Sequence, residues 1–505
     1  MAYASLEQRH WLDRELTAVQ ARWFFFVAVL AFALPFILAD YRYVDDNWRS
    51  ELDVQRAWRV EGRILAELFY RLMTFSGVTV DIFPLPLLLA CVAMAFGLAA
   101  LVRHYFIEPR LGHCLVVLPL WFCPMWLGNL TYQYDGPTMT LSLVAAIYAV
   151  VWRGRNTLLN VLVPGLILGA ALCFYQVTVN VFIGLCCLEL VRSVRFQLPT
   201  ASAFALLGRQ LCQLSIALVI YYATAYQLMQ TNRTGMLPFN AEGAGELGLR
   251  LGLIVHKVSL FLTPGNTWMW VALAVLAGIG YLWVAARLLR SVGVAGLGSL
   301  VLYVVALPVM ALSVGGMILP FADFTLEART LMGMAPVLVL LFYLAQFSLS
   351  RVHARLEWLL LLPLLCMLSL AFVYGRVLQA QKDLERTLAH DLHHDITNLP
   401  ELRDKQPIYW TSTDCSGSWL PALSGTLENL PALRFVLSLK PCEMSTVENL
   451  TDLHLEANDE LFSQLMVQGQ GQRLVDNQYY DIWLLNGYGY VALKPVDKTP
   501  KLPTD

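Results

Sequence analysis

The sequence WFFFVAVLAFALPFILA, residues 23–39, is an unbroken apolar run that ends in the polar sequence DYRY. A helix of about 20 mainly apolar residues crosses the hydrocarbon core of a bilayer. The run is too long for the apolar region of a cleavable signal peptide, and no small-residue cleavage site follows it. The sequence therefore predicts a permanent membrane span here.

The composition extends this prediction to the whole chain. The 505 residues are 57% hydrophobic and only 14% charged, and the mean hydropathy is +0.57. These values are typical of a polytopic membrane protein. The net charge of −2 gives no bias toward nucleic acid. We therefore expect the lipid bilayer as a partner, and no nucleic acid.

The hydropathy pattern predicts an α-helical protein with about eleven transmembrane helices. They lie at residues 22–39, 84–102, 114–127, 138–151, 158–174, 177–191, 201–229, 267–286, 297–319, 331–349 and 359–374. Several are short, and polar residues lie where pairs of them meet, at 126–137 and at 173–180. Short spans with polar tips indicate a cavity that opens to one side of the membrane.

The arginines of the short loops predict the orientation. With eleven spans, one side receives Arg103, Arg110, Arg153, Arg155, Arg192, Arg195, Arg209, Arg287, Arg290, Arg351 and Arg355. By the positive-inside rule this side is cytoplasmic, and the N-terminus is cytoplasmic with it. The other side receives the loop 40–83 and the tail from residue 375. In a bacterial inner membrane that side is the periplasm.

The tail differs from the rest of the chain in composition. Residues 377–392 form a polar helical run, and the segments 407–411, 434–439 and 481–485 have strand-like sequences. We predict a small periplasmic α+β domain at 376–505, after a transmembrane domain at 1–375.

The two cysteines of the tail, Cys415 and Cys442, lie away from the hydrophobic spans. An oxidising compartment such as the periplasm permits a disulfide between them. Spacing alone does not fix a bridge, so two unpaired thiols are the alternative.

The first outer loop, 40–83, carries the strongest functional signal. Asp45 and Asp46 are adjacent at the membrane surface, where two carboxylates repel and raise at least one pKa unless a cation compensates. Four arginines follow, and one helix over 47–73 would gather them on one face: Arg49, Arg56, Arg59 and Arg63. Arginine forks match phosphate oxygens. The alternative is an amphipathic helix whose arginines neutralise nearby acids and contact lipid headgroups.

Two further segments combine aromatic and polar groups suited to a sugar. The turn NLTYQYDGP, 129–137, offers Tyr132, Gln133 and Asp135, although polar turn residues and interfacial tyrosines are also ordinary there. The polar break CFYQVTVN, 173–180, offers Tyr175 and Gln176, for which an interhelical hydrogen bond is the alternative.

Two more cations could meet a lipid phosphate. Lys257 lies in the hydrophobic stretch 249–262, and Arg329 leads into the tenth span. Snorkelling of the side chain to the membrane surface is the simpler account of Lys257.

The sequence has no nucleotide-binding glycine pattern, no HExxH and no CxxC. The run HDLHH at 390–394 is more typical of solvated helix surface than of a metal site. We therefore expect no cofactor and no metal. An enzyme outside the cytoplasm has no access to nucleotide sugars, so its substrate must arrive activated and carried in the membrane.

Several segments in order resemble the bacterial serotype-converting glucosyltransferase family (glucosyl transferase type II). They are RYVDDNWR (42–49), EGRILAELFYRLM (61–73), DIFPLPLLLA (81–90), GNLTYQYDGPTM (128–139), LCFYQVTVNVFI (172–183) and ARTLMGMAPVLVL (328–340), with LQAQKDLERTLAHDL (378–392) in the tail. The resemblance implies a GT-C-type glycosyltransferase. Its donor would be a polyprenyl-phosphate sugar, commonly glucose, and its acceptor a surface polysaccharide such as lipopolysaccharide O-antigen.

On that reading, Asp45 or Asp46 takes the proton of an acceptor hydroxyl, and direct displacement inverts the anomeric carbon. The negative charge that grows on the leaving polyprenyl phosphate would be stabilised by cations, for which the candidates are Arg49, Arg56, Arg59, Arg63, Lys257 and Arg329. Tyr132, Gln133, Asp135, Tyr175 and Gln176 would form the sugar pocket. The alternatives are a lipid or sugar transporter and a non-catalytic polysaccharide-assembly protein.

Overall fold

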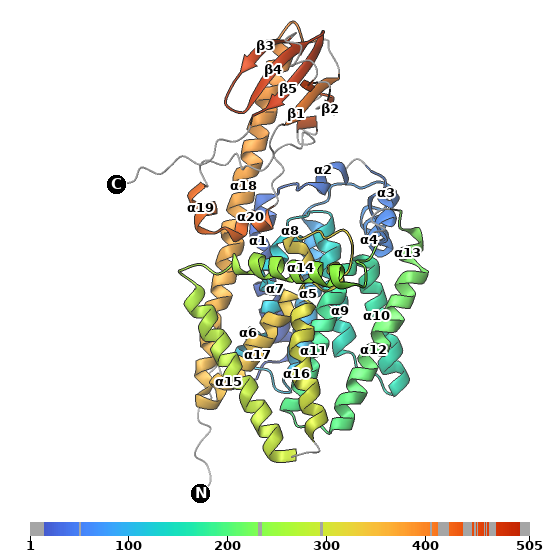
Figure 1. Cartoon of the computed structure of the whole chain (residues 1–505), viewed down its shortest axis with the longest axis vertical. Helices are drawn as coiled ribbons and strands as arrows, with labels where there is room; N and C mark the ends of the chain where they lie inside the picture. The colour runs from blue at the N-terminus through green and yellow to red at the C-terminus, as the bar shows by residue number, and fades with distance from the viewer. Residues whose placement is uncertain are drawn as a thin grey trace, which may run out of the picture. The chain divides into compact units, whose positions relative to one another are not determined.

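The computed structural model describes most of the chain, which is mainly helical with one small sheet (Figure 1). The described residues are 15–49, 52–230, 235–292, 296–403, 407–412, 424–437, 447–448, 451, 453–458, 460, 462–463 and 471–494. They divide into two compact units. Unit 1 comprises Met1–Ile37 and Glu51–Phe372, and unit 2 comprises Leu38–Ser50 and Val373–Asp505.

Each of the eleven predicted spans overlaps a helix. Eight helical stretches of the described chain are long and apolar enough to cross a membrane. They are α1 (Ala18–Ala39), α5 (Leu85–Tyr105), α10 (Thr157–Phe174), η4 with α11 (Gln176–Thr178, Val179–Arg195), α12 with α13 (Thr200–Ala223, Ala225–Leu228), α15 (Thr267–Val292), α17 (Met334–Val352) and η8 with α18 (Ala354–Leu360, Leu361–Asn398).

The three remaining predicted spans overlap shorter or bent helices. One is a pair bent by 40°, Leu111–Phe122 and Pro124–Leu130, built from α6 (Leu111–Val117), α7 (Pro119–Phe122), η3 (Pro124–Trp126) and α8 (Leu127–Leu130). The others are α9 (Asp135–Val151) and α16 (Leu297–Leu312). The apolar helices indicate a membrane protein, while the number eleven stays a prediction.

The arginine-rich ends of several helices of unit 1 meet. Arg192 of α11 donates to the backbone oxygen of His104, at the end of α5, at 2.7 Å. The guanidinium of Arg195 lies 4.5 Å from the ring centre of Tyr343 on α17. Arg351, in the last turn of α17, lies 4.4 Å from the ring centre of Trp283 on α15. Arg192, Arg195 and Arg351 therefore lie near the ends of packed helices, while the membrane side of these ends stays a prediction.

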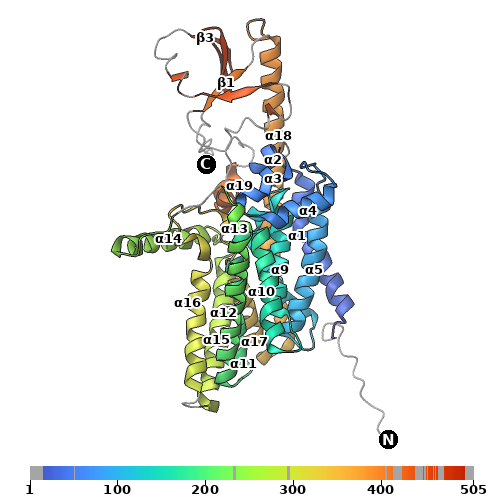
Figure 2. The same ribbon diagram turned by 90° about the vertical axis from the view of Figure 1, so that its right-hand side faces the viewer.

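One amphipathic helix, α14 (Ala241–Ser259), lies across the long helices (Figures 1 and 2). Its buried Arg250 donates to the backbone oxygens of Leu319 at 2.9 Å and Ala322 at 3.2 Å, while Leu249 and Val255 are exposed. A helix with one anchored polar residue and an exposed apolar face is suited to the membrane interface.

The prediction of a single helix over 47–73 is wrong. The segment is divided among α2 (Asp45–Arg49), α3 (Val54–Trp58), η2 (Arg59–Glu61) and α4 (Ile64–Thr74). Gly62 separates the last two with a φ of 73°, in the left-handed region that favours glycine. A Cβ at Gly62 would lie 2.7 Å from the Tyr221 hydroxyl, so a side chain there would also require a shift of the Tyr221 side chain. The four arginines therefore do not share one helix face.

The other short helices of unit 1 are η6 (Gly316–Ile318) and η7 (Ala328–Thr330). Gly128 in α8 lets η7 approach, because a Cβ there would lie 3.0 Å from the backbone nitrogen of Arg329. This contact brings two of the sequence-predicted segments, 129–137 and 328–340, together.

Unit 2 contains a five-stranded sheet in the order β2-β1-β5-β4-β3. The strands are β1 (Ile408–Ser412), β2 (Leu455–Ala457), β3 (Gly471–Asp476), β4 (Tyr480–Leu485) and β5 (Tyr488–Leu493). β1 pairs in parallel with β2 and β5, and β3, β4 and β5 form an antiparallel meander. Leu392 and Ile396 of α18 are buried in one core with Ile408, Ile482 and Val491 of the sheet.

Two of the three strands predicted in the tail are confirmed, since β1 and β4 lie at 407–411 and 481–485. The third is wrong, because Ala432–Val436 is a helix, α20. Pro431 precedes it, and proline favours a helix start because its φ is already helical. The remaining helix of the unit is α19 (Ser424–Asn429). Cys415 and Cys442 lie outside the described residues, so the disulfide stays a prediction.

Candidate functional site

The aspartate pair lies in unit 2. Asp45 and Asp46 form the first turn of α2. Asp46 is fully buried and its carboxylate accepts the backbone N–H of Tyr43 at 3.0 Å, while Asp45 is half-buried. In the last turn of the same helix, Arg49 is buried with its guanidinium 4.6 Å from the ring centre of Trp48.

Residues 38–50 belong to unit 2 because polar contacts tie them to α18. Lys382 binds Asp40 at 2.7 Å, and the Tyr41 hydroxyl donates to Glu385 at 2.7 Å. Burial and the Glu385 charge raise the pKa of Tyr41 well above its usual range. The carboxylate pair is therefore attached to the helix that leads into the tail. The three other arginines of the loop lie in unit 1, so their grouping with the pair remains a prediction.

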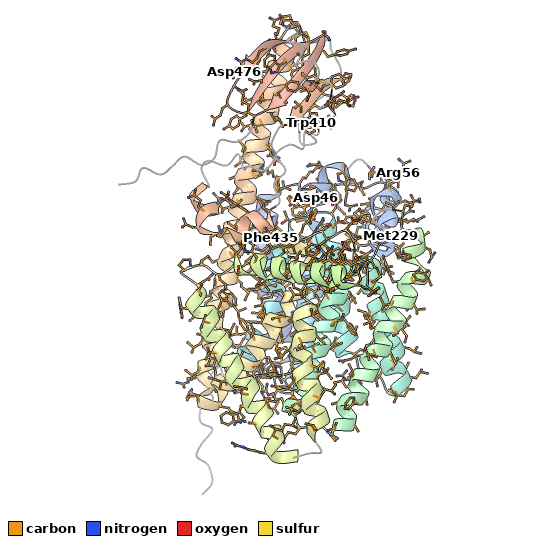
Figure 3. All side chains as sticks on the ribbon, in the orientation of Figure 1. Asp46, Arg56, Met229, Trp410, Phe435 and Asp476 are labelled. Carbon is orange, nitrogen blue, oxygen red and sulfur yellow. The ribbon has the colours of Figure 1, made fainter. Side chains whose placement is uncertain are left out.

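Those three arginines have different environments. Arg56 is at the periphery of unit 1 (Figure 3), with 76% of its side chain exposed. Arg59 binds both oxygens of Glu67, at 2.7 and 2.6 Å, and this bond raises the pKa of Arg59. Arg71 also binds Glu67, at 2.9 Å. Arg59 is thus held in a local ion-pair network, and Arg56 faces solvent.

Arg63 is 15% exposed and reaches inward to Asp135, 3.3 Å away, with Glu61 at the same distance. Asp135 starts α9, is fully buried, and also accepts the indole N–H of Trp58 at 2.6 Å. The Trp58 ring stacks on Tyr70 with ring centres 4.5 Å apart. Trp58 of α3 and Arg63, directly before α4, therefore both contact one carboxylate at the start of α9. A buried tryptophan needs an acceptor for its N–H, which is the signal that could have identified Trp58 from the sequence.

Tyr175 is buried, and several charged groups of the site influence it. The guanidinium of Arg63 lies 5.1 Å from its ring centre. Burial raises the pKa of Tyr175; the charges of Arg329 and Arg63 oppose this, and those of Glu327 and Asp135 add to it. These four residues come from separate parts of the chain. Arg329 lies in η7 and Glu327 directly precedes η7, whereas Arg63 directly precedes α4 and Asp135 begins α9.

Arg329 extends this group. Its guanidinium lies 4.7 Å from the ring centre of Tyr132, and its Nε donates to Glu327 at 2.5 Å. We use the term Tyr175 cluster for Arg63, Tyr132, Asp135, Tyr175 and Arg329. The cluster combines two guanidinium groups, two tyrosine rings and a carboxylate. Phosphate oxygens, sugar faces and sugar hydroxyls are the partners of these groups, respectively.

Three residues predicted for the sugar pocket or the phosphate are not members of the Tyr175 cluster. Gln176 donates to the backbone oxygens of Glu61 at 3.0 Å and Gly62 at 3.3 Å, and to the Tyr221 hydroxyl at 2.8 Å. These bonds give it a structural task in holding the loop before α4. Gln133 lines a cavity of only about 10 Å³ with Asp81, which has room for about one water. Lys257 lies near the end of α14.

No group of three or more histidine, cysteine, aspartate or glutamate side chains is placed to hold a metal ion, as far as the described residues go. The expectation of no metal and no cofactor therefore stays a prediction.

The fold and the cluster define a polytopic helical membrane protein with a charged, aromatic site where helices α9, α10 and α11 begin or end, and with a small α+β unit. The chain belongs to the family described as Glucosyl transferase GtrII, whose model matches residues 34–390. This match confirms the resemblance found in the sequence, and it supports a glycosyltransferase.

A curated relative from Salmonella phage P22, described as an uncharacterized 55.3 kDa protein in the gtrB 5′ region, is 26% identical over 153 residues. The matched segment covers 30% of this chain and 31% of that protein. No solved structure matches the chain.

Proposed function

We propose that the protein transfers a sugar, glucose in the first instance, from a polyprenyl-phosphate carrier to a surface polysaccharide such as lipopolysaccharide O-antigen. The reaction takes place on the periplasmic face of a bacterial inner membrane. The family match supports sugar transfer. The Tyr175 cluster is the observation that carries the donor assignment, because one guanidinium group lies against Tyr175 and another against Tyr132 where helices of the bundle end, and both charges influence the Tyr175 hydroxyl.

The orientation follows from the two ends of the same helices. α9 begins at Asp135 in the cluster and ends at Val151, next to Arg153. α11 begins just after Tyr175 and carries Arg192 and Arg195 in its last turn. If the arginine-rich end is cytoplasmic by the positive-inside rule, the Tyr175 cluster faces the periplasm. A lipid carrier supplies an activated sugar there.

The proposed reaction is a direct displacement. The acceptor hydroxyl oxygen bonds to the anomeric carbon as the bond from that carbon to the phosphate oxygen breaks, and its electron pair leaves with the phosphate. Asp45 or Asp46 accepts the hydroxyl proton. Arg63 and Arg329 stabilise the charge that grows on the leaving phosphate, and attack from the opposite face inverts the anomeric centre.

We propose a narrower division of work than the sequence predicts, supported by the contacts of the arginines. Among the arginines predicted for the phosphate, Arg63 and Arg329 are in the cluster, whereas Arg56 is mostly exposed and Arg59 is bound to Glu67. Between the two aspartates, half-buried Asp45 is accessible to an acceptor. Buried Asp46 is bonded to the backbone of its own turn.

The test measures transfer of labelled glucose from polyprenyl-phosphate glucose to polysaccharide in membranes that contain the full chain. Arg63→Gln should reduce transfer by about 100-fold or more, while the matched control Arg56→Gln should stay within about twofold because that side chain faces solvent. Activity with a nucleotide sugar, and none with the lipid donor, would refute the donor assignment.

The base is tested separately with Asp45→Asn and Asp46→Asn at normal expression. Loss of a general base reduces the rate by about 10²- to 10⁴-fold. Full transfer by both variants would refute the catalytic role of the pair. A reporter fused after residue 494 that responds only in the cytoplasm would contradict the orientation.

A further inference from the structure

A second polar site lies at the other end of the helices. A pocket of about 550 Å³ is lined by residues of α5, α11 and α12 and of the connection between α9 and α10, with Arg153, Glu189, Arg192 and Arg209 among them. We call it the arginine pocket. Its volume is within the range of about 300–1,000 Å³ that is usual for ligand sites. Because α9 has 17 residues, at about 1.5 Å each, its two ends are about 25 Å apart. The pocket is therefore distinct from the Tyr175 cluster.

The charges of the arginine pocket do not balance. Glu189 is buried and binds Arg192 at 2.5 Å and His104 at 3.0 Å, with Arg153 at 3.7 Å. The lining therefore holds three arginines, Arg209 being the third, and one carboxylate. Two positive charges are left over, even with the histidine neutral.

Two observations indicate that this surplus charge is poorly compensated by the residues that line the pocket. The buried Nε of Arg209 has no hydrogen-bond partner in the described part of the chain. Burial lowers the pKa of Arg153, and the neighbouring charges of Arg209 and Arg192 lower it further, against the opposing effect of Glu189. Mutual repulsion among arginines is relieved by an anion that binds between them.

The rest of the pocket wall is apolar. Phe196, Leu198, Ala205 and Leu206 line it beside the arginines, and Phe196 and Leu198 are about half exposed, at 54% and 46%. A wall of this kind adjoining a set of guanidinium groups is suited to a ligand with one anionic end and one apolar end. Guanidinium forks bind two phosphate oxygens at once.

We propose that the arginine pocket binds the phosphate group of an anionic lipid, with the apolar wall against the first part of its chains. Glu189 positions Arg192 and His104, and Arg209 and Arg153 contact the phosphate. The proposal does not depend on the transfer reaction, because the pocket and the Tyr175 cluster lie at opposite ends of the helices.

The test is native mass spectrometry of the full chain in detergent, with phosphatidylglycerol or phosphatidylcholine added. The wild type should retain phosphatidylglycerol in preference to phosphatidylcholine, and Arg209→Gln should lower that retention by at least about fivefold. Arg290→Gln is the matched control, since it removes an exposed arginine outside the pocket. Arg153→Gln, whose side chain is 47% exposed, should also lower retention and carries the test if Arg209→Gln fails to fold.

Equal retention of phosphatidylglycerol by the wild type, Arg209→Gln and Arg153→Gln would overturn the proposal, as would equal retention of the two lipids. A parallel arm measures thermal unfolding with inorganic phosphate. Stabilisation by inorganic phosphate that requires Arg209, without retention of either lipid, would overturn the lipid assignment and identify a soluble phosphate compound as the ligand.

Discussion

The Arg63–Asp135 ion pair offers the sharpest test of the site geometry. Arg63→Gln removes the charge and leaves Asp135 buried, still accepting the indole N–H of Trp58. At the 3.3 Å separation and an effective dielectric constant of about 20, the attraction is about 5 kcal/mol before desolvation is subtracted.

The net cost of the substitution is smaller than this attraction. Removing one partner of a buried pair lowers the free energy of unfolding by about 3–5 kcal/mol. The Trp58 bond at 2.6 Å stays, and the Arg63 side chain is 15% exposed. We therefore expect the lower end of that range, about 3 kcal/mol. Arg56→Gln is the control and should cost less than about 1 kcal/mol, because its pair with Asp53 is exposed.

The assay is reversible unfolding by sodium dodecyl sulfate in mixed micelles, applied as a double-mutant cycle. Arg63→Gln, Asp135→Asn and the double variant are compared with the wild type. The coupling energy of the pair should exceed about 1.5 kcal/mol, within the range observed for residues in direct contact. A coupling below about 0.5 kcal/mol, or equal costs for Arg63→Gln and Arg56→Gln, would refute this description of the site.

Four further predictions concern other parts of the molecule. Gln176→Leu removes three hydrogen bonds and should lower the free energy of unfolding by about 1–3 kcal/mol in the same assay. Gly184→Ala should be destabilising by about 1–3 kcal/mol because its Cβ would lie 2.6 Å from the Pro336 side chain. Gly208→Ala, with nothing within 4 Å, should instead be stabilising by about 0.5–1 kcal/mol. Burial and a bond to an aspartate raise the pKa of Tyr480. The stability that protonated Tyr480 contributes is therefore complete below a pH of about 10, its pKa in the unfolded chain. It is lost as the pH rises through the pKa of Tyr480 in the folded chain. Tyr480→Phe should flatten this fall in the free energy of unfolding when it is measured against pH.

Helices in the membrane part could be predicted because their formation depends on local composition. An apolar stretch in a bilayer satisfies its backbone groups only as a helix, and every predicted span overlaps one. Polar residues at 173–180 and 129–137 predict interruptions between helices. In the structure α10 ends at Phe174 in the first segment, and α9 begins at Asp135 in the second.

The tail shows where local sequence is not sufficient. The strands near 407–411 and 481–485 are rich in aromatic and branched residues and pair in one sheet. The segment 434–439 has a similar composition, yet its first part is helical after Pro431. A strand requires a partner at its edge, and composition does not reveal whether one is present.

The sequence by itself determined the class of protein, the positions of its apolar helices, the family and the residue types of the candidate site. Only the tertiary structure decided which of those residues meet. In the folded chain the helical segment 47–73 is interrupted at Gly62, Arg59 pairs with Glu67, and Arg63 pairs with Asp135. The physical reason is that helix formation follows from composition along the chain, whereas ion pairs and aromatic contacts depend on how separate helices pack against one another.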